Sequence, residues 1–175
     1  MTFKVLLANW WSPSPELGSH TRTKRKRGEQ LGVISLMGGR RLEKEELESI
    51  LEESKIARIC CHNENGTIHA TPVWYKYING NIVFVTVDSS IKGRNLKRNK
   101  NVTVLIDVRE PAAKGVMIYG TAELEYGDTF PMSLTICEKY LDKEKAKSFA
   151  EMMVSETGID TIVTVKPERM ITFHF

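Results

Sequence analysis

Cysteine is scarce in this chain, and long apolar runs are absent. The 175 residues include only three Cys, too few and too unevenly spaced for a disulfide framework or a zinc site. Cys60 and Cys61 are adjacent, so in a strand they would face opposite sides. We expect buried or half-buried thiols, a reducing cytoplasmic setting and no metal. Because the short apolar opening leads into Trp-Ser-Pro-Ser-Pro rather than a cleavage site, we expect neither a signal peptide nor a membrane span.

The signatures of several enzyme classes are missing too. The sequence holds no HExxH pair, Walker loop, Ser/His/Asp set or paired-carboxylate signal. These absences argue against the hydrolase and nucleotidase classes that depend on such motifs. The catalytic residues stay unknown at this level, and the candidate acid or base groups are Tyr75, His69 and His174.

Positive charge is concentrated at one end of the chain. The formal net charge is +3, yet residues 1–41 hold eight Lys/Arg against two Glu, whereas residues 42–175 are mildly acidic. The first segment is punctuated by Pro and Gly and includes the run Lys24-Arg25-Lys26-Arg27. Such a run is typical of a nucleic-acid contact or an address, but a flexible basic tail explains it more simply. We therefore expect a flexible arm at 1–41, one folded domain at 42–175, and no nucleic-acid partner.

Hydrophobic periodicity predicts a mainly β domain. A helical period marks residues 42–54, and a period of two follows. Turn-forming residues then separate the expected strands, at 56–62, 67–77, 82–87, 102–108, 116–126, 159–165 and 169–175, with Gly120 as a bulge. Capping signals predict helices at 128–141 and 143–156. Because most connections are short hairpins, we expect an antiparallel sheet that closes into a small barrel and so removes its edges.

Pro72 interrupts the expected strand at 67–77. Proline cannot donate a ladder hydrogen bond, so it belongs at an edge or a bulge. A barrel split at this point would expose backbone donors and acceptors, which suit the edge of a planar heterocycle. Trp74 and Tyr75 would face opposite sides, and Trp74 either borders a ligand or only packs. His69 either lies beside a ligand or meets solvent or a carbonyl.

The stretch from Val85 to Asn101 predicts a phosphate site. An apolar run reaches Thr86, breaks at Asp-Ser-Ser and opens a helix that carries five basic residues. Free N–H groups and the positive end of the helix dipole favour an anion at such a helix start. Ser and Thr hydroxyls add hydrogen bonds, and Lys92 adds a point charge. The alternative is a solvated helix with Ser90 as its N-cap.

Four segments carry a family resemblance: ARICCHNENGTIHATPVWY, IVFVTVDSSIKGRNLKRNKNV, GVMIYGTAEL and VKPERMITFHF. In this order and spacing they resemble the flavin-binding split-barrel family, the pyridoxamine 5′-phosphate oxidase-related proteins. The resemblance implies a six-stranded antiparallel split β-barrel and a homodimer, with flavin mononucleotide (FMN) in a cleft between the subunits. Residues 71–74 would border the isoalloxazine ring, and hydroxyls with Lys92 would hold the phosphate. The implied cofactor contacts are Thr71, Pro72, Val73, Trp74, Val85, Thr86, Ser89, Ser90, Lys92 and Asn95.

Two departures from the true oxidase shape the functional expectation. That enzyme has Arg at the positions corresponding to Thr71 and Ile91, and this chain has no match for its substrate-gripping C-terminal Trp and Arg. The resemblance therefore implies an FMN-dependent oxidoreductase of the broader family, acting on a small organic substrate. The alternatives are a reductase that uses a deazaflavin coenzyme, and a flavin- or haem-binding protein without turnover.

Overall fold

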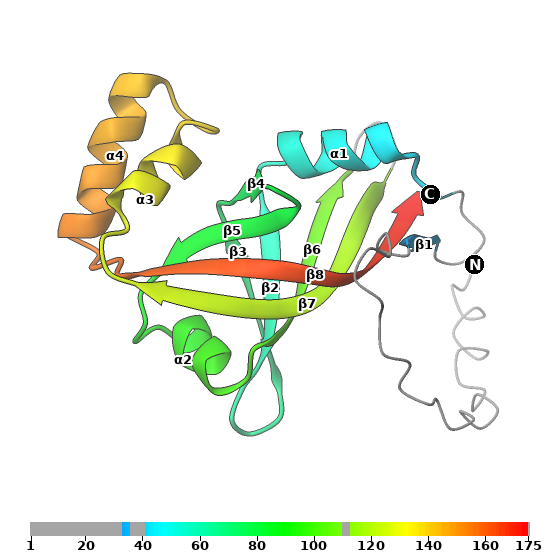
Figure 1. The fold of residues 1–175 in the computed structure, drawn as a ribbon, viewed down its shortest axis with the longest axis horizontal. Coiled ribbons are helices and arrows are strands. Elements are labelled where there is room, and N and C mark those ends of the chain that lie inside the picture. Colours follow the sequence, from blue (N-terminus) through cyan, green and yellow to red (C-terminus); the bar gives the residue numbers. More distant parts are fainter. Residues whose placement is uncertain (1–32, 36–40, 110–112, 175) are drawn as a thin grey trace, which may run out of the picture. The chain divides into compact units, whose positions relative to one another are not determined.

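Residues 33–35, 41–109 and 113–174 are described by the computed structural model, in which one mainly antiparallel sheet organises the chain (Figure 1). Its strands are β1 (Val33–Ser35), β2 (Ala57–His62), β3 (Ile68–Val73), β4 (Lys76–Ile78), β5 (Asn81–Thr86), β6 (Asn101–Val108), β7 (Lys114–Tyr126) and β8 (Thr161–His174). The helices are α1 (Lys44–Glu53), α2 (Ile91–Arg98), α3 (Phe130–Cys137) and α4 (Lys143–Ser155). Most of the expected arm, including its basic run, lies outside the described residues; within it, β1 pairs in parallel with β8.

The sheet follows the order β3-β2-β6-β7-β8-β5-β4. Every ladder along this path is antiparallel. The two end strands, β3 and β4, are consecutive in the chain, and only Trp74 and Tyr75 separate them. The sheet therefore curls back on itself and leaves a split between β3 and β4. This arrangement confirms the predicted mainly β, antiparallel split-barrel fold with peripheral helices.

The expected strand at 67–77 is divided into β3 and β4, and the path has seven strands, one more than the six that the family resemblance implies. Pro72 lies in β3, an edge strand whose ladder partner on the path is β2. Its missing N–H therefore costs little there. The strand ends directly after Val73, and the next two residues contact Tyr140, which lies between α3 and α4.

The expected strands at 159–165 and 169–175 are instead one continuous strand, β8. Pro167 pairs with Gly120 and Arg169 pairs with Tyr119, so Glu168 is an extra residue at this register shift. A bulge of this kind accommodates the proline without ending the strand. A Cβ at Gly120 would lie 2.2 Å from the carbonyl oxygen of Lys166, so glycine is needed for the close approach. The bulge predicted at Gly120 is thus found in the strand opposite it.

Alternate residues of β2 and β6 fill the inside of the barrel. Ile59 of β2 and Val104 of β6 are register partners, and both are fully buried. Adjacent residues point the other way, so Cys61 is buried and Cys60 is only half-buried. This confirms the expected opposite orientation of the two thiols, and burial raises the pKa of both.

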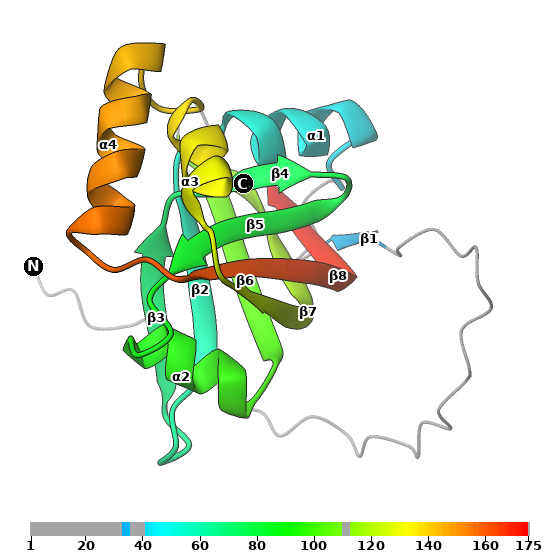
Figure 2. The same cartoon turned by 60° about the vertical axis from the view of Figure 1, so that its left-hand side comes forward.

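The helices lie at two ends of the sheet. Figures 1 and 2 show α1 and the α3–α4 pair at one end and α2 at the other. α1 buries Ile50 and Leu51. α3 and α4 pack on each other around Cys137, Ala146 and Ala150, in an apolar cluster separate from the barrel core. In the part of the chain that the structure describes, no helix combines the length and apolarity that a membrane crossing needs.

Candidate functional site

A tight turn connects β5 to α2. The N–H of Ser90 donates to the carbonyl of Val87 at 3.0 Å, and the Ser90 hydroxyl accepts from the N–H of Gly93 at 3.1 Å. Ser90 is therefore the N-cap of α2, as the simpler interpretation predicts. The cap by Ser90 still leaves two donors for a ligand. In the described residues the N–H groups of Ile91 and Lys92 donate to no backbone carbonyl.

Gly93 allows the helix to touch the turn that precedes it. A Cβ at this position would lie 2.4 Å from the carbonyl oxygen of Asp88 and 2.5 Å from that of Val87. Both contacts are to backbone atoms, which cannot move aside as a flexible side chain can. The position therefore requires glycine for a close approach of backbone to backbone.

Lys92 brings an unpaired positive charge to this turn. Its side chain is half-buried, and burial lowers the pKa of its ammonium, an effect that nearby Cys61 opposes. Among the described residues, no carboxylate or carbonyl forms a hydrogen bond or ion pair with its Nζ. In the same turn the buried Thr86 hydroxyl lies 3.2 Å from that of Ser90. A partly desolvated cation, hydroxyls and free N–H groups together suit an anion. We call residues 86–92 the anion loop.

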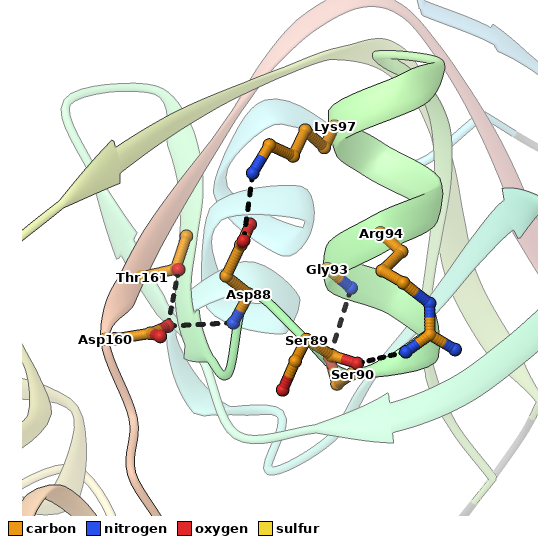
Figure 3. A network of polar contacts seen from close by, with 8 residues as sticks. All are labelled: Asp88, Ser89, Ser90, Gly93, Arg94, Lys97, Asp160 and Thr161. Carbon is orange, nitrogen blue, oxygen red and sulfur yellow. Dashed lines mark hydrogen bonds and ion pairs between the residues drawn. The ribbon is translucent and has the colours of Figure 1, made fainter.

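Apart from Lys92, the charged groups in and beside the anion loop are engaged in hydrogen bonds (Figure 3). Lys97 Nζ lies 3.0 Å from Asp88 Oδ2, and the pair raises the pKa of the lysine. Asp160 Oδ1 accepts from the backbone N–H of Asp88 at 2.8 Å and from the Thr161 hydroxyl at 2.7 Å. The Thr161 bond, followed by the Asp88 bond, holds the pKa of Asp160 below its ordinary value. Asp160, just before β8, thus stabilises the loop although it is distant from the loop in the sequence.

Asn95 serves mainly to position α2. Its Nδ2 donates to Asn63 Oδ1 at 2.8 Å and approaches Cys61 Sγ at 3.7 Å, and its Oδ1 accepts from Arg98 at 3.3 Å. These bonds tie the helix to the end of the β2–β3 hairpin and use the donors of the amide. A direct cofactor contact from Asn95 stays a prediction.

The remaining predicted cofactor contacts lie on strands β3 and β5. Thr71 and Val73 are half-buried and pair in register with the core residues of β2, whereas Pro72 is exposed. Val85 is half-buried in β5 and directly precedes the anion loop. α2 contacts β2 and also β3, the strand that carries residues 71–73. Their binding roles stay predictions.

Tyr140 satisfies the backbone hydrogen-bonding groups of Tyr75 at the split between β3 and β4. Its ring stacks on Trp74, with centroids 4.4 Å apart and planes 4° from parallel. Its hydroxyl accepts from the N–H of Tyr75 at 2.9 Å and donates to the carbonyl of the same residue at 3.0 Å. One phenol therefore satisfies both backbone groups where the chain leaves the sheet. The Trp74 ring therefore packs against other side chains, and a contact of Trp74 with a ligand stays a prediction.

The three candidate acid or base groups lie in different surroundings. Tyr75 is fully buried, its hydroxyl donates to the Leu51 carbonyl at 2.8 Å, and burial raises its pKa. The Tyr75 hydroxyl therefore stays protonated at neutral pH, and its proton is used in the hydrogen bond to Leu51. His69 is half-buried opposite Cys61, and His174 has a buried Nδ1 with no hydrogen-bond partner among the described residues. The geometry gives neither histidine a reacting partner.

Lys139 is a buried cation outside these predictions. Its Nζ lies 3.7 Å from the centre of the Tyr75 ring and has no hydrogen-bond acceptor among the described residues. Burial lowers the pKa of this ammonium to about 8; Glu52 opposes the shift, and Lys55 and Lys76 add to it. The ring favours the charged form, but it does not replace the hydrogen bonds lost to water.

We expect the Lys139→Met variant to have a higher free energy of unfolding at pH 7, by about 1 kcal/mol after allowance for partial exposure. The pKa of Lys139 falls from 10.5 when unfolded to about 8 when folded, so wild-type stability rises with pH between these values. The advantage of the variant should therefore shrink above pH 8. Urea unfolding across this pH range tests this, with the exposed Lys143→Met as control. A variant less stable at pH 7 would show that the Tyr75 contact outweighs burial.

Comparison with known proteins places the chain in a family. The family model described as pyridoxamine 5′-phosphate oxidase matches residues 43–159, which is more than half of the chain. No curated protein matches the chain. The family match covers α1, the anion loop and the α3–α4 pair, and it leaves out only β1 and β8 among the elements.

Solved structures share the same fold at low sequence identity. The conserved hypothetical protein Rv2991 from Mycobacterium tuberculosis is 20% identical, with a TM-score of 0.66, over 78% of this chain and 87% of that one. A structure named F420 reductase is 18% identical, with a TM-score of 0.59, over 70% of this chain and 94% of that one. An FAD-binding protein from Mesorhizobium loti is 18% identical, with a TM-score of 0.54, over 77% and 96%. With the family match and this shared split-barrel fold, the chain belongs to the pyridoxamine 5′-phosphate oxidase family.

Proposed function

We propose that this chain binds a flavin-type coenzyme, FMN or a deazaflavin coenzyme, and uses it in the oxidoreduction of a small organic substrate. The observation that carries the proposal is Lys92, which belongs to the same turn as two hydroxyls and two free N–H groups and whose half-buried ammonium has no protein partner among the described residues. Burial without a carboxylate partner is costly for an ammonium, and a bound anion would offset that cost. The names of two structural neighbours, an F420 reductase and an FAD-binding protein, are consistent with such a coenzyme.

The residues present fit the phosphate end of the coenzyme well. Lys92 would supply the charge, the N–H groups of Ile91 and Lys92 would point at the phosphate oxygens, and Ser89 is exposed and able to donate its hydroxyl. Thr86 and Ser90 would hold the shape of the loop through their mutual contact. The segment at 71–74 would border the ring through its backbone, with the Trp74 side chain held away on Tyr140.

A bound flavin-type coenzyme supplies the two-electron chemistry, and the protein orients it and excludes competing reactions. In this proposal the chain contributes binding and positioning, because none of the three candidate acid or base groups has a reacting partner. The alternative without turnover shares the same binding residues. Steady reduction by a nicotinamide donor, coupled to an acceptor, would separate the enzyme from a carrier or sensor.

We also propose that two copies of the chain associate. The outer face of the sheet carries a hollow of about 570 Å³ that is lined by residues of five strands and includes Ile68, whose side chain is 55% exposed. An exposed face of this kind is suited to a second subunit. Light scattering of the purified protein should give a dimer mass, and a monomer at micromolar concentration would contradict this part of the proposal.

The absorption spectrum of the purified full-length protein tests the proposed coenzyme, together with mass spectrometry of any small molecule released on denaturation. We expect a flavin or deazaflavin spectrum, either as purified or after addition of the coenzyme. A haem spectrum would instead support the non-catalytic haem-binding alternative. A colourless protein that gives no heat in calorimetric titration with FMN or the deazaflavin coenzyme would contradict the proposal.

A further inference from the structure

The charge around the anion loop is small. Lys97 is neutralised by Asp88, and Asp160 places a second carboxylate against the loop backbone (Figure 3). On the positive side stand Lys92 and Arg94, whose guanidinium donates to the carbonyl of Ser89. The three cations and two carboxylates in and beside this loop therefore sum to a net charge of about +1. Among the three cations, Lys92 is half-buried, and Arg94 and Lys97 are exposed.

Two described positions that could carry a second cation, Ile91 and Thr71, are neutral. Ile91 occupies the first turn of α2 with its side chain 51% exposed, and Thr71 lies on β3, the strand that α2 contacts. The other basic residue of the helix facing β2, Arg98, is directed to the carbonyl of His62 and to Asn95. The loop thus offers one desolvated charge and few donors: two N–H groups, the Lys92 ammonium, the Ser89 hydroxyl, and the one O–H of the Thr86–Ser90 pair that is not used within the pair.

A phosphodiester matches this arrangement better than a phosphomonoester does. At neutral pH a phosphomonoester carries a charge of about −1.5 to −2 on three acceptor oxygens. A phosphodiester carries a single charge on two free oxygens, which one ammonium and a few N–H and O–H donors can satisfy. Transfer of an uncompensated second charge from water to a partly buried site is costly.

We propose that the anion loop selects a phosphodiester over a phosphomonoester, so that the coenzyme is a flavin or deazaflavin whose phosphate carries a further substituent. This inference rests on the proposed function and sharpens it, because it favours an extended coenzyme over FMN itself. The exposed Arg94 lies on the same turn and offers a contact to the substituent beyond the phosphate.

Three ligands with the same ring test the inference: FMN, its phosphate methyl ester, and riboflavin. Fluorescence titration of the full-length protein should show that the methyl ester binds as tightly as FMN or more tightly, and that both bind more tightly than riboflavin. Tighter binding of FMN than of its methyl ester would overturn the inference while the proposed function stands. If neither phosphate ligand binds more tightly than riboflavin, the anion loop does not hold phosphate and the proposed function itself fails.

A variant of the exposed residue Ile91 provides an independent test on the same ligands. Ile91→Arg adds a second cation beside Lys92, and it should shift the preference toward FMN by about tenfold relative to the wild type. Ile91→Met changes the side chain without adding charge, and it should leave the ratio of the two affinities unchanged. An Ile91→Arg protein with the wild-type ratio would show that charge does not decide between the two esters.

Discussion

The Gly93→Ala variant is expected to lose about 1–3 kcal/mol of stability and to bind FMN at least about tenfold more weakly. The added Cβ would lie 2.4 Å from the Asp88 carbonyl oxygen and 2.5 Å from that of Val87, far inside any normal contact. Either the turn or the start of α2 must move. Both carry the groups of the anion loop, so the N–H groups of Ile91 and Lys92 would lose their common direction.

The expected loss of stability makes the Gly93→Ala test specific, because it is opposite to the usual effect of this substitution in a helix. Gly→Ala in a helix normally stabilises a protein by about 0.5–1 kcal/mol, because alanine loses less backbone entropy on folding. Ser148→Ala, at an exposed position in α4, is a matched gain of helix propensity without crowding, and it should leave FMN affinity unchanged. Thermal unfolding and fluorescence titration measure both effects. A Gly93→Ala protein that is more stable and binds FMN as the wild type does would contradict the close packing described here.

The second large effect is expected from Lys92. Lys92→Met keeps much of the apolar stem and removes the ammonium, and with it one charge-assisted hydrogen bond to the phosphate worth about 1.5–3 kcal/mol. FMN affinity should fall by about 10- to 150-fold. The folded protein should be as stable as the wild type or more so, because the lysine is partly desolvated without a partner.

Lys100→Met is the matched control for this experiment. Lys100 lies just beyond the end of the same helix and is exposed, so its removal changes the net charge equally without touching the anion loop. Its effect on FMN affinity should be small and should vanish as salt is added. Equal losses in the two variants would mean that Lys92 acts only through the general charge of the helix.

Local patterns in the sequence predicted the features that depend on neighbouring residues. Alternating hydrophobicity predicted the strands, and the sequence Asp-Ser-Ser before a basic helix predicted both the N-cap at Ser90 and the anion loop. Each of these signals needs only residues within one or two turns of the chain. Pro72 indicated the split between β3 and β4, and the family resemblance implied a split barrel as well.

Features that depend on distant partners were not accessible to the same reasoning. Tyr140 is 65 residues from Tyr75, yet it satisfies the backbone there and holds Trp74, so the strand at 67–77 is interrupted. Asp160 braces Asp88 across 72 residues. Asn95 shares a helix face with Lys92, but its amide is used by Asn63, which no local pattern indicates. The requirement for glycine at position 93 appears only once the turn and the helix are seen in contact.

Four affinities test the central claim most directly: those of FMN and riboflavin for the wild-type protein and for Lys92→Met, measured by calorimetry in one buffer. The two ligands differ only in the phosphate, and the two proteins differ only in the ammonium, so the coupling between the changes reports their contact. We predict that FMN binds more tightly than riboflavin in the wild type and that most of this preference disappears in the variant. An undiminished preference in Lys92→Met would place the phosphate elsewhere and contradict the account.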